Sequence, residues 1–360
     1  MLTFFIVLTA LLTLFTLLPL ARIDAWPVRI LDFPRLQIAA LWVADIIGLT
    51  LLLGFEATAA LTMFAIACGG LAYQLWWILP YTRLYQCEVK SCAQPSPERT
   101  ISIVTANVLT PNRGADQLLQ QVRQLKPDLL VTLESDQWWQ EQLDVLQADY
   151  PHTLKCPLDN LYGMHLYSQL PLRDATINFL VEDDKPSMHA EVVLRSGDKV
   201  RCHFLHPAPP SPTENSESSE RDAELLVVAR SLEGVTDPII VTGDLNDVAW
   251  SRTTKAFRRI SRLLDPRIGR GMFNTFHAEH RLLRWPLDHV FHSDHFTLVD
   301  MHRLQPFGSD HFALFTQLAF TPRQQTQQER PEASADEQQF AEDKVADQDV
   351  NKHQVPKPGQ

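Results

Sequence analysis

The sequence predicts an α/β sandwich that follows three apolar helices. Between residues 99 and 321, short β-rich runs such as "ISIVTANVL", "PIIVTGDL" and "HFALFTQLAF" alternate with stretches of helical periodicity. A glycine-rich phosphate loop is missing from these runs. Mixed strands with interspersed helices favour a sandwich over a parallel nucleotide-binding sheet.

Three apolar stretches open the chain, over residues 2–20, 36–55 and 58–80. Each has about 20 residues, the length that an α-helix needs to cross a bilayer. Trp76, Trp77 and Tyr81 fit an aromatic belt at the membrane surface. Buried core helices are the alternative. A signal peptide is a further alternative for the first stretch, but its basic amino-terminal flank is missing and two more spans follow.

Basic residues predict which side of the membrane the rest of the chain occupies. Arg22, Arg29 and Arg35 lie in the first loop, and Arg83 and Lys90 follow the third span, whereas the turn between spans two and three has no Lys or Arg. With three spans, the first loop and the remainder of the chain share one face. The positive-inside rule places that face in the cytoplasm.

Two features of this region leave alternatives open. A disulfide between Cys87 and Cys92 would argue for the opposite orientation, because disulfides persist in oxidising compartments. Asp45 lies inside the second span, where a carboxylate is costly unless it pairs or faces protein. It serves either helix packing or a site.

Beyond the spans we expect a linker over residues 84–98, a folded domain over 99–321 and a disordered polar tail over 322–360. The tail is rich in Gln, Glu, Asp, Lys and Pro and nearly free of aromatic residues. The net charge of −11 argues against a general DNA-coating role, but not against a nuclease with a local basic groove. Residues that could line such a groove are Arg258, Arg259, Arg262, Arg267 and Arg270; the alternative is a solvated face with ion pairs.

Polar side chains follow or precede the apolar strands of the domain at several places. They are Asn107, Glu134, His206, Asp244, Asn246, Asp288, Asp310 and His311. Buried carboxylates need partners, and one cation would satisfy several of them together. Oxygen ligands without cysteine indicate a hard ion, Mg²⁺ or Mn²⁺.

Taken singly, these residues also have structural interpretations. Asn107 fits a turn or cap, Glu134 a helix start, Asp244 an Asx-turn and His206 a core histidine. Other histidines are interpreted as structural, although His277 could line a pocket.

The end of one strand gives a finer expectation. Strand alternation places Asp244 and Asn246 on one face, while Leu245 points to the core. Asp247 then falls on the other face, as a turn or cap residue.

The order of Asn107, Glu134, His206, "GDLN", "LDHVF" and "SDH" resembles the DNase I-like endonuclease/exonuclease/phosphatase superfamily, over about residues 102–320. The chain also resembles bacterial membrane-anchored members. The resemblance implies a four-layer α/β sandwich, formed by two packed mixed sheets with helices outside, and Mg²⁺-dependent hydrolysis of a phosphodiester or phosphomonoester.

The resemblance also implies a role for each residue. Glu134 would be the main metal ligand, with Asn107 beside it and Asp310 sharing the metal shell. Asp244 would orient or deprotonate the attacking water. Roles on the phosphate fall to three further residues: Asn246 and His206 would donate to its oxygens, and His311 would stabilise the pentavalent transition state or assist proton transfer. Asp288 would fix the tautomer of that histidine.

We therefore expect a metal-dependent phosphoesterase of the bacterial inner membrane, with its catalytic domain in the cytoplasm. Its substrate would be a phosphate ester of a lipid headgroup, a nucleotide or a nucleic acid, and no obligate protein partner is evident. The alternatives are a nuclease proper and an inactive binding scaffold of the same fold. An inactive scaffold would lack at least one of the principal site residues. All of them are present: Glu134, Asp244, Asn246, Asp288 and His311.

Overall fold

The computed structural model describes residues 1–54, 57–322 and 327–359, which form two compact units. The helical unit comprises Met1–Gln86, Pro210–Ser218 and Gly269–Gly271. The sandwich unit comprises Cys87–Pro209, Ser219–Ile268 and Met272–Gln360.

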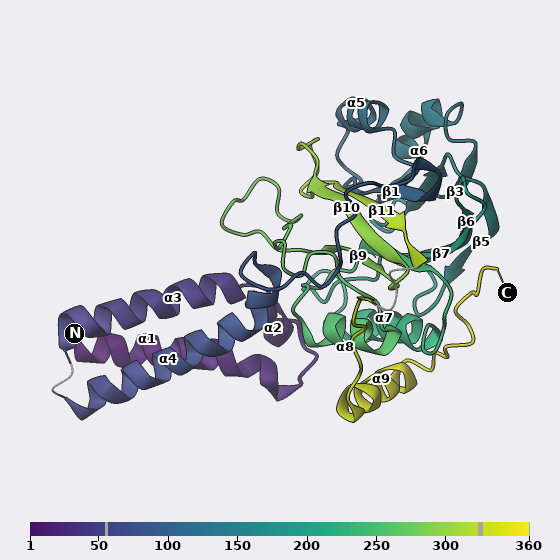
Figure 1. Cartoon of the computed structure of the whole chain (residues 1–360). Helices are drawn as coiled ribbons and strands as arrows, with labels where there is room; N and C mark the ends of the chain where they lie inside the picture. The colour runs from purple at the N-terminus through teal and green to yellow at the C-terminus, as the bar shows by residue number, and fades with distance from the viewer. Residues whose placement is uncertain (55–56, 323–326, 360) are drawn as a thin grey trace. The chain divides into compact units, whose positions relative to one another are not determined.

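The helical unit contains α1 (Leu2–Leu17), α2 (Trp26–Arg29), α3 (Arg35–Gly48) and α4 (Thr58–Ile78). In Figure 1, α1, α3 and α4 run side by side. With their terminal turns, three helices in the described part of the chain are long and apolar enough to cross a membrane: Leu2–Ala21, Arg35–Leu53 and Thr58–Tyr81. The expected end of the second span, at Phe55, lies outside the described residues.

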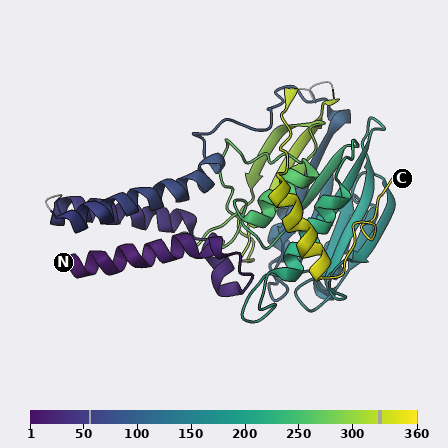
Figure 2. The ribbon, with the colours of Figure 1, turned by 90° about the horizontal axis from the view of Figure 1, so that it is seen from below.

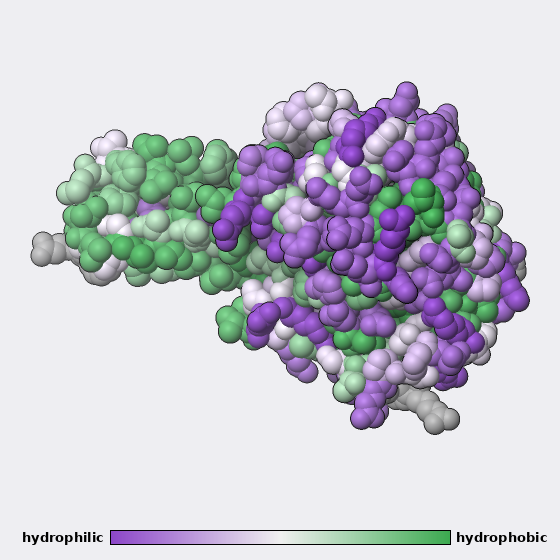
Figure 3. Space-filling model, turned by 90° about the horizontal axis from the view of Figure 1, so that it is seen from above, coloured by the Kyte–Doolittle hydropathy of each residue, from purple (hydrophilic) through white to green (hydrophobic). Residues whose placement is uncertain are grey.

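Several polar side chains of this unit are buried, among them Thr9, Asp45 and Gln74, whereas the face of the helices seen in Figure 3 is mostly apolar. The Thr9 hydroxyl donates to Asp45 Oδ2 at 3.0 Å and so joins α1 to α3. Asp32 pairs with Arg35 at 2.5 Å and with Arg29 at 3.6 Å. These contacts support the packing role for Asp45. They also show that two arginines of the basic loop are neutralised within the unit.

Part of the expected linker packs on the sandwich unit. Val89 is buried in the core, and Lys90 O and Cys92 N bond the backbone of Leu298 at 2.8 Å each. Cys87 and Cys92, both among the described residues, form no disulfide.

The sandwich unit contains two mixed sheets. The first has the order β10-β11-β1-β2-β4-β3 and the second the order β5-β6-β7-β8-β9. The strands of the first sheet are β1 (Thr100–Asn107), β2 (Leu129–Leu133), β3 (His152–Cys156), β4 (Met164–Ser168), β10 (Phe296–Arg303) and β11 (Leu314–Phe320). Those of the second are β5 (Leu172–Phe179), β6 (Pro186–Val193), β7 (Lys199–Leu205), β8 (Ile239–Asp244) and β9 (Asp288–His292).

Helices cover the outer face of each sheet, which gives four layers (Figures 1 and 2). They are α5 (Ala115–Leu125) and α6 (Gln137–Leu143) on the first sheet, and α7 (Ser219–Ser231), α8 (Arg252–Ser261) and α9 (Ala335–Asp347) on the second. In β8, Ile240 packs into the core between the sheets, while Ile239 and Val241 pack under the helices. The predicted four-layer α/β sandwich is confirmed.

The carboxyl-terminal segment differs from the disordered tail that its composition predicts. Ser334 and Glu337 form a capping box at the start of α9. Ala341 and Val345 of this helix are buried in the apolar cluster that α7 and α8 share. A narrow apolar stripe and a good cap thus order a polar sequence; residues 323–326 and 360 lie outside the described part.

A buried hydrogen bond joins the two sheets. Thr105 of β1 and Thr242 of β8 lie 2.8 Å apart, hydroxyl to hydroxyl. Both side chains are fully buried, so the bond fixes how these two strands pack.

Candidate active site

The topology brings all eight expected residues to one edge of the sandwich. β1 runs parallel to β2, and β7 runs parallel to β8, so the carboxyl ends of these four strands carry Asn107, Glu134, His206 and Asp244. β9 and β11 run antiparallel to their neighbours. Their first residues therefore lie at this same edge, and they carry Asp288 and, just before β11, Asp310 and His311.

Glu134 is held at the end of β2 with one oxygen left over. Asn107 Nδ2 donates to Glu134 Oε1 at 2.7 Å and to Asp244 Oδ2 at 3.1 Å. Glu134 Oε2 is buried and has no hydrogen-bond partner. Burial raises the pKa of Glu134 to about 7, and the Asn107 hydrogen bond offsets part of this effect. A buried carboxylate oxygen of this kind is costly unless a ligand completes it.

Glu134 also adopts a strained backbone. Its φ is 57°, in the left-handed region that non-glycine residues rarely occupy. Thr110 supports the turn, because its hydroxyl donates to Glu134 O at 2.8 Å.

His311 bridges two carboxylates. Its Nδ1 lies 2.8 Å from Asp288 Oδ2 and its Nε2 lies 3.5 Å from Asp244 Oδ2. Burial lowers the pKa of His311, but the two carboxylates outweigh it and raise the pKa to about 10. These three groups also lie close enough to ligate a metal ion together. A protonated imidazole would balance the charge of the two carboxylates without an ion.

His206 is buried, and neither of its ring nitrogens has a hydrogen-bond partner. Burial lowers its pKa to about 4, so the ring is neutral near pH 7. Tyr162 packs against it with ring centroids 5.2 Å apart. Asp244 and His311 lie within electrostatic range of this histidine. A neutral imidazole with free nitrogens suits hydrogen bonding to a ligand in the site.

The loop after β8 differs from simple strand alternation. The strand ends at Asp244, and Asn246 has a φ of 50°. Asn246 Nδ2 donates to Pro207 O at 3.0 Å, and its backbone N–H donates to Asp244 Oδ1 at 2.9 Å. The amide nitrogen carries a second hydrogen that can donate to a ligand.

Asp247 has the capping role that the sequence predicts. It accepts hydrogen bonds from the hydroxyl of Ser251, the N-cap residue of α8, and from Thr254 Oγ1. Its carboxylate therefore anchors the start of α8 instead of entering the site.

Sequence reasoning named Arg267 only as a candidate groove residue, and it missed the buried contacts that support the site from behind. Arg267 pairs with Asp265 at 2.8 Å, lies 2.7 Å from His289 Nδ1 and donates to Asp288 O at 3.4 Å. Arg221 donates to Asn246 O at 2.9 Å. These partners are distant in sequence or lie in loops without a motif, so only the position of His289 beside Asp288 offered a signal.

Two further residues set the backbone of the site. The Ser309 hydroxyl donates to Asn107 O at 2.8 Å and accepts from His311 N at 3.0 Å, which ties the loop before β11 to the end of β1. Gly243 lies against Leu205 O, where a Cβ atom would collide with the neighbouring strand. The close approach of β7 and β8 at the site therefore requires glycine.

The residues present fit a hard divalent cation. Glu134 Oε2 lacks a partner, and Asp310 is near enough to raise the pKa of Glu134 electrostatically. Asn107 faces the same place with its amide nitrogen, while its amide oxygen accepts from Leu109 N at 3.1 Å. Carboxylate and amide oxygens are the ligands that Mg²⁺ and Mn²⁺ prefer.

The expected basic groove is instead a set of ion pairs. The pairs are Arg258–Glu88 at 2.5 Å, Arg259–Glu337 at 2.8 Å, Arg262–Glu332 at 3.0 Å and Arg267–Asp265 at 2.8 Å. Arg270 belongs to the helical unit. Four of the five arginines are thus committed to carboxylates, as in the alternative interpretation of this segment.

The family model described as "Endonuclease/Exonuclease/phosphatase family" matches residues 104–311, more than half of the chain. The chain belongs to this family. The match spans the strand ends from Asn107 to His311 and so covers the part of the sandwich that carries the site. Members are hydrolases acting on phosphate esters, and they generally use divalent metals.

Solved structures share the fold of the sandwich unit. Humanized D. rerio TDP2 carrying 14 mutations has a TM-score of 0.51 and 17% identity, over 61% of this chain and 99% of that chain. The human Nocturnin catalytic domain with bound sulfate has a TM-score of 0.50 and 16% identity, over 62% and 96%. A family protein from Beutenbergia cavernae has a TM-score of 0.50 and 16% identity, over 62% and 72%. No curated protein sequence matches the chain.

Proposed function

We propose that the protein is a membrane-anchored, divalent-metal-dependent phosphoesterase that hydrolyses its substrate by in-line attack of water. The observation that carries this proposal is the convergence of eight polar residues at one edge of the sandwich. Among them, Glu134 Oε2 and both nitrogens of His206 are buried without partners. Such groups persist where a ligand completes them.

The first sheet supplies the residues for the metal. Glu134, Asp310 and Asn107 would hold Mg²⁺ or Mn²⁺. When bound, this ion polarises the phosphoryl oxygens and offsets the charge that develops on them.

The other residues would act on the phosphate and on water. Asp244 orients the attacking water and accepts its proton through a carboxylate oxygen. His206 and Asn246 donate N–H groups to phosphate oxygens. The imidazolium of His311, oriented by Asp288, stabilises the pentavalent transition state and protonates the leaving oxygen.

A small or lipid-borne phosphate ester is the substrate class that the surface favours. Nucleases of extended DNA or RNA need free basic side chains along the backbone path. Here four of the expected arginines are paired with carboxylates. The three apolar helices add support, since an anchor would keep the site near lipid headgroups.

We further propose that the chain lies in a bacterial inner membrane with the sandwich unit in the cytoplasm. The support is the positive-inside pattern of its loops. A reporter fused after Arg83 measures this directly, and periplasmic activity of the reporter would reverse the orientation.

The function is tested with the full chain in detergent and Mg²⁺. Plasmid DNA, phospholipid vesicles, inositol phosphates and a chromogenic phosphodiester are offered in parallel. We expect turnover of the chromogenic ester and of a lipid or small phosphate ester. We expect Asp244→Ala and His311→Ala to lower kcat by about 10²–10³-fold, because each removes a group that acts in the transition state.

The matched control is Asp300→Ala, which removes a half-exposed carboxylate of β10 that pairs with His302. Full turnover in both site variants would contradict the mechanism. Cleavage of plasmid DNA alone would establish the nuclease alternative, and inactivity of the wild type on every substrate would favour the binding scaffold.

A further inference from the structure

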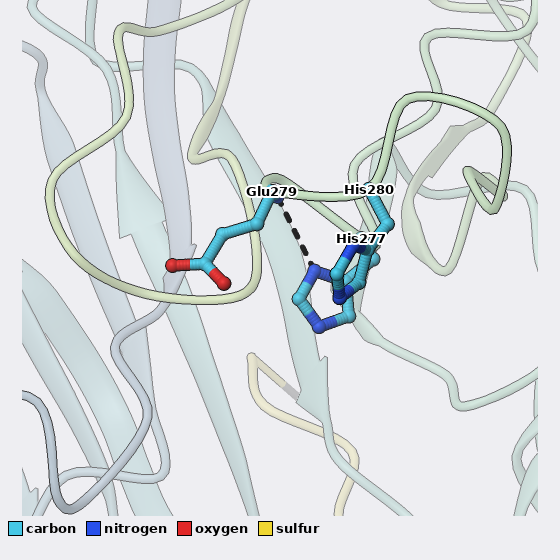
Figure 4. Close-up of side chains that lie close together, drawn as sticks. All are labelled: His277, Glu279 and His280. Atoms are coloured by element: carbon cyan, nitrogen blue, oxygen red, sulfur yellow. Dashed lines mark hydrogen bonds between the residues drawn. The ribbon is translucent and has the colours of Figure 1, made fainter.

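A second group of metal-binding side chains lies on the loop that precedes β9. Residues 275–285 form a hairpin, here called the histidine hairpin, in which Phe276 and Trp285 pair through their backbones. Its turn carries His277, Glu279 and His280, whose ligand atoms all lie within 4.8 Å of one another. The two imidazole rings lie side by side in Figure 4, with centroids 4.5 Å apart.

The backbone of the hairpin holds the two histidines in place. His277 N donates to Leu283 O, and Leu283 N donates to His280 O, each at 3.0 Å. Arg284 closes the turn, since its Nε donates to His277 O at 3.1 Å and its Nη2 to Ala278 O at 2.6 Å. The positions of both ligands are therefore set before any ion binds, which lowers the cost of ordering them.

The donor set differs in kind from that of the catalytic edge. Two imidazoles and one carboxylate suit Zn²⁺ and related transition metals, whereas Mg²⁺ and Mn²⁺ prefer oxygen ligands. Three protein ligands leave a fourth tetrahedral position open to water or another ligand. Glu279 and His280 are exposed and His277 is partly exposed, so an ion can reach them.

Metal binding would replace one hydrogen bond of the turn. His277 Nδ1 accepts a hydrogen bond from Glu279 N at 3.2 Å (dashed in Figure 4). An ion on Nδ1 replaces this long bond, and water can then satisfy the exposed N–H. The loss is small compared with a metal–imidazole bond.

The hairpin also contacts the catalytic edge. Ala278 N donates to Asp310 O at 2.6 Å, and the Phe276 ring packs on His311 with centroids 5.0 Å apart. An ion on the turn would thus stiffen a segment bonded to the loop that carries two site residues.

We propose that His277, Glu279 and His280 form a transition-metal site of the Zn²⁺ class, separate from the hard-ion site at the strand ends. This proposal concerns binding and does not depend on the proposed catalytic function.

The test is a calorimetric titration of the full chain in detergent with Zn²⁺, in millimolar Mg²⁺ and without a polyhistidine tag. We expect one Zn²⁺ to bind to the wild type and to Glu134→Gln alike. In His277→Ala/His280→Ala, binding of this ion should weaken at least tenfold. The matched control is His302→Ala, which removes an exposed histidine of β10 and should bind as the wild type does.

A second variant gives a direct signature at the turn. With Co²⁺ as the probe, His280→Cys should add a thiolate charge-transfer band that the wild type lacks, because sulfur would enter the metal shell. Equal Zn²⁺ binding by the wild type and the double histidine variant would overturn the proposal. A wild-type site that disappears in Glu134→Gln, or the absence of the Co²⁺ band, would overturn it too.

Discussion

Two buried carboxylates of the sandwich unit differ in whether both of their oxygens have partners within the chain. Behind β9, Asp265 accepts from Arg267 with both oxygens, and the pair is fully buried. At the strand ends, Glu134 has one oxygen bonded to Asn107 and the other without a partner. The first arrangement is complete within the chain and serves the fold. The second is incomplete and fits a ligand from outside the chain.

The largest expected effect comes from breaking the complete pair. Arg267→Met leaves the Asp265 carboxylate buried without its partner, so we expect the free energy of unfolding to fall by about 3–5 kcal/mol. Denaturant titration of the full chain in detergent measures it. The control is Arg262→Met, which removes an exposed ion pair with Glu332. We expect it to lower the free energy of unfolding by less than about 1 kcal/mol.

The comparison also predicts a rescue. Asp265→Leu combined with Arg267→Met removes both charges and should recover much of the lost stability. A double variant as unstable as Arg267→Met alone would show that the pairing is not the source of the effect.

At the incomplete cluster, activity and stability should separate. Glu134→Gln should lower kcat by about 10²–10³-fold, because it removes the charge that holds the metal. Its melting temperature should stay equal or rise, since a buried charge is removed. Activity and thermal melts of the same preparation measure both, and a loss of stability like that of Arg267→Met would show that Glu134 serves the fold instead.

A smaller effect is expected at Glu224 of α7, a third buried carboxyl group. Burial, with Glu182 nearby, raises its pKa to about 8. The folded state therefore binds this proton more tightly than the unfolded state, and the stabilisation present below about pH 4.5 is lost as the pH rises toward 8. Glu224→Gln should remove this loss, so we expect its free energy of unfolding at pH 8 to exceed that of the wild type by about 1–3 kcal/mol.

The control for Glu224→Gln is the same measurement at pH 5, where the two proteins should differ little. Unfolding curves at the two pH values decide the matter. A stability difference that does not change with pH would show that titration of Glu224 is not its cause.

The strand-end residues were predictable because their signal is local. Asn107, Glu134 and Asp244 each lie at the end of an apolar run. Parallel pairing of β1 with β2 brings the first two together, whereas Asp244 joins them only through the packing of the second sheet on the first. The supporting contacts were not predictable. Arg221 and Arg267 pair with carboxylates close by in sequence, but they reach Asn246 and His289 only in the folded chain. The same limit explains α9. Ala341 and Val345 are buried only because they pack against helices about one hundred residues away in the sequence.

The threonine bond between β1 and β8 joins two halves of one site. Asn107, Glu134 and Asp310 come from the first sheet, whereas His206, Asp244 and Asp288 come from the second. Any ligand held by both halves is also a clamp across the interface of the sandwich. Binding would therefore resist sliding of one sheet on the other. A ligand that binds only the folded domain should also raise the domain's free energy of unfolding.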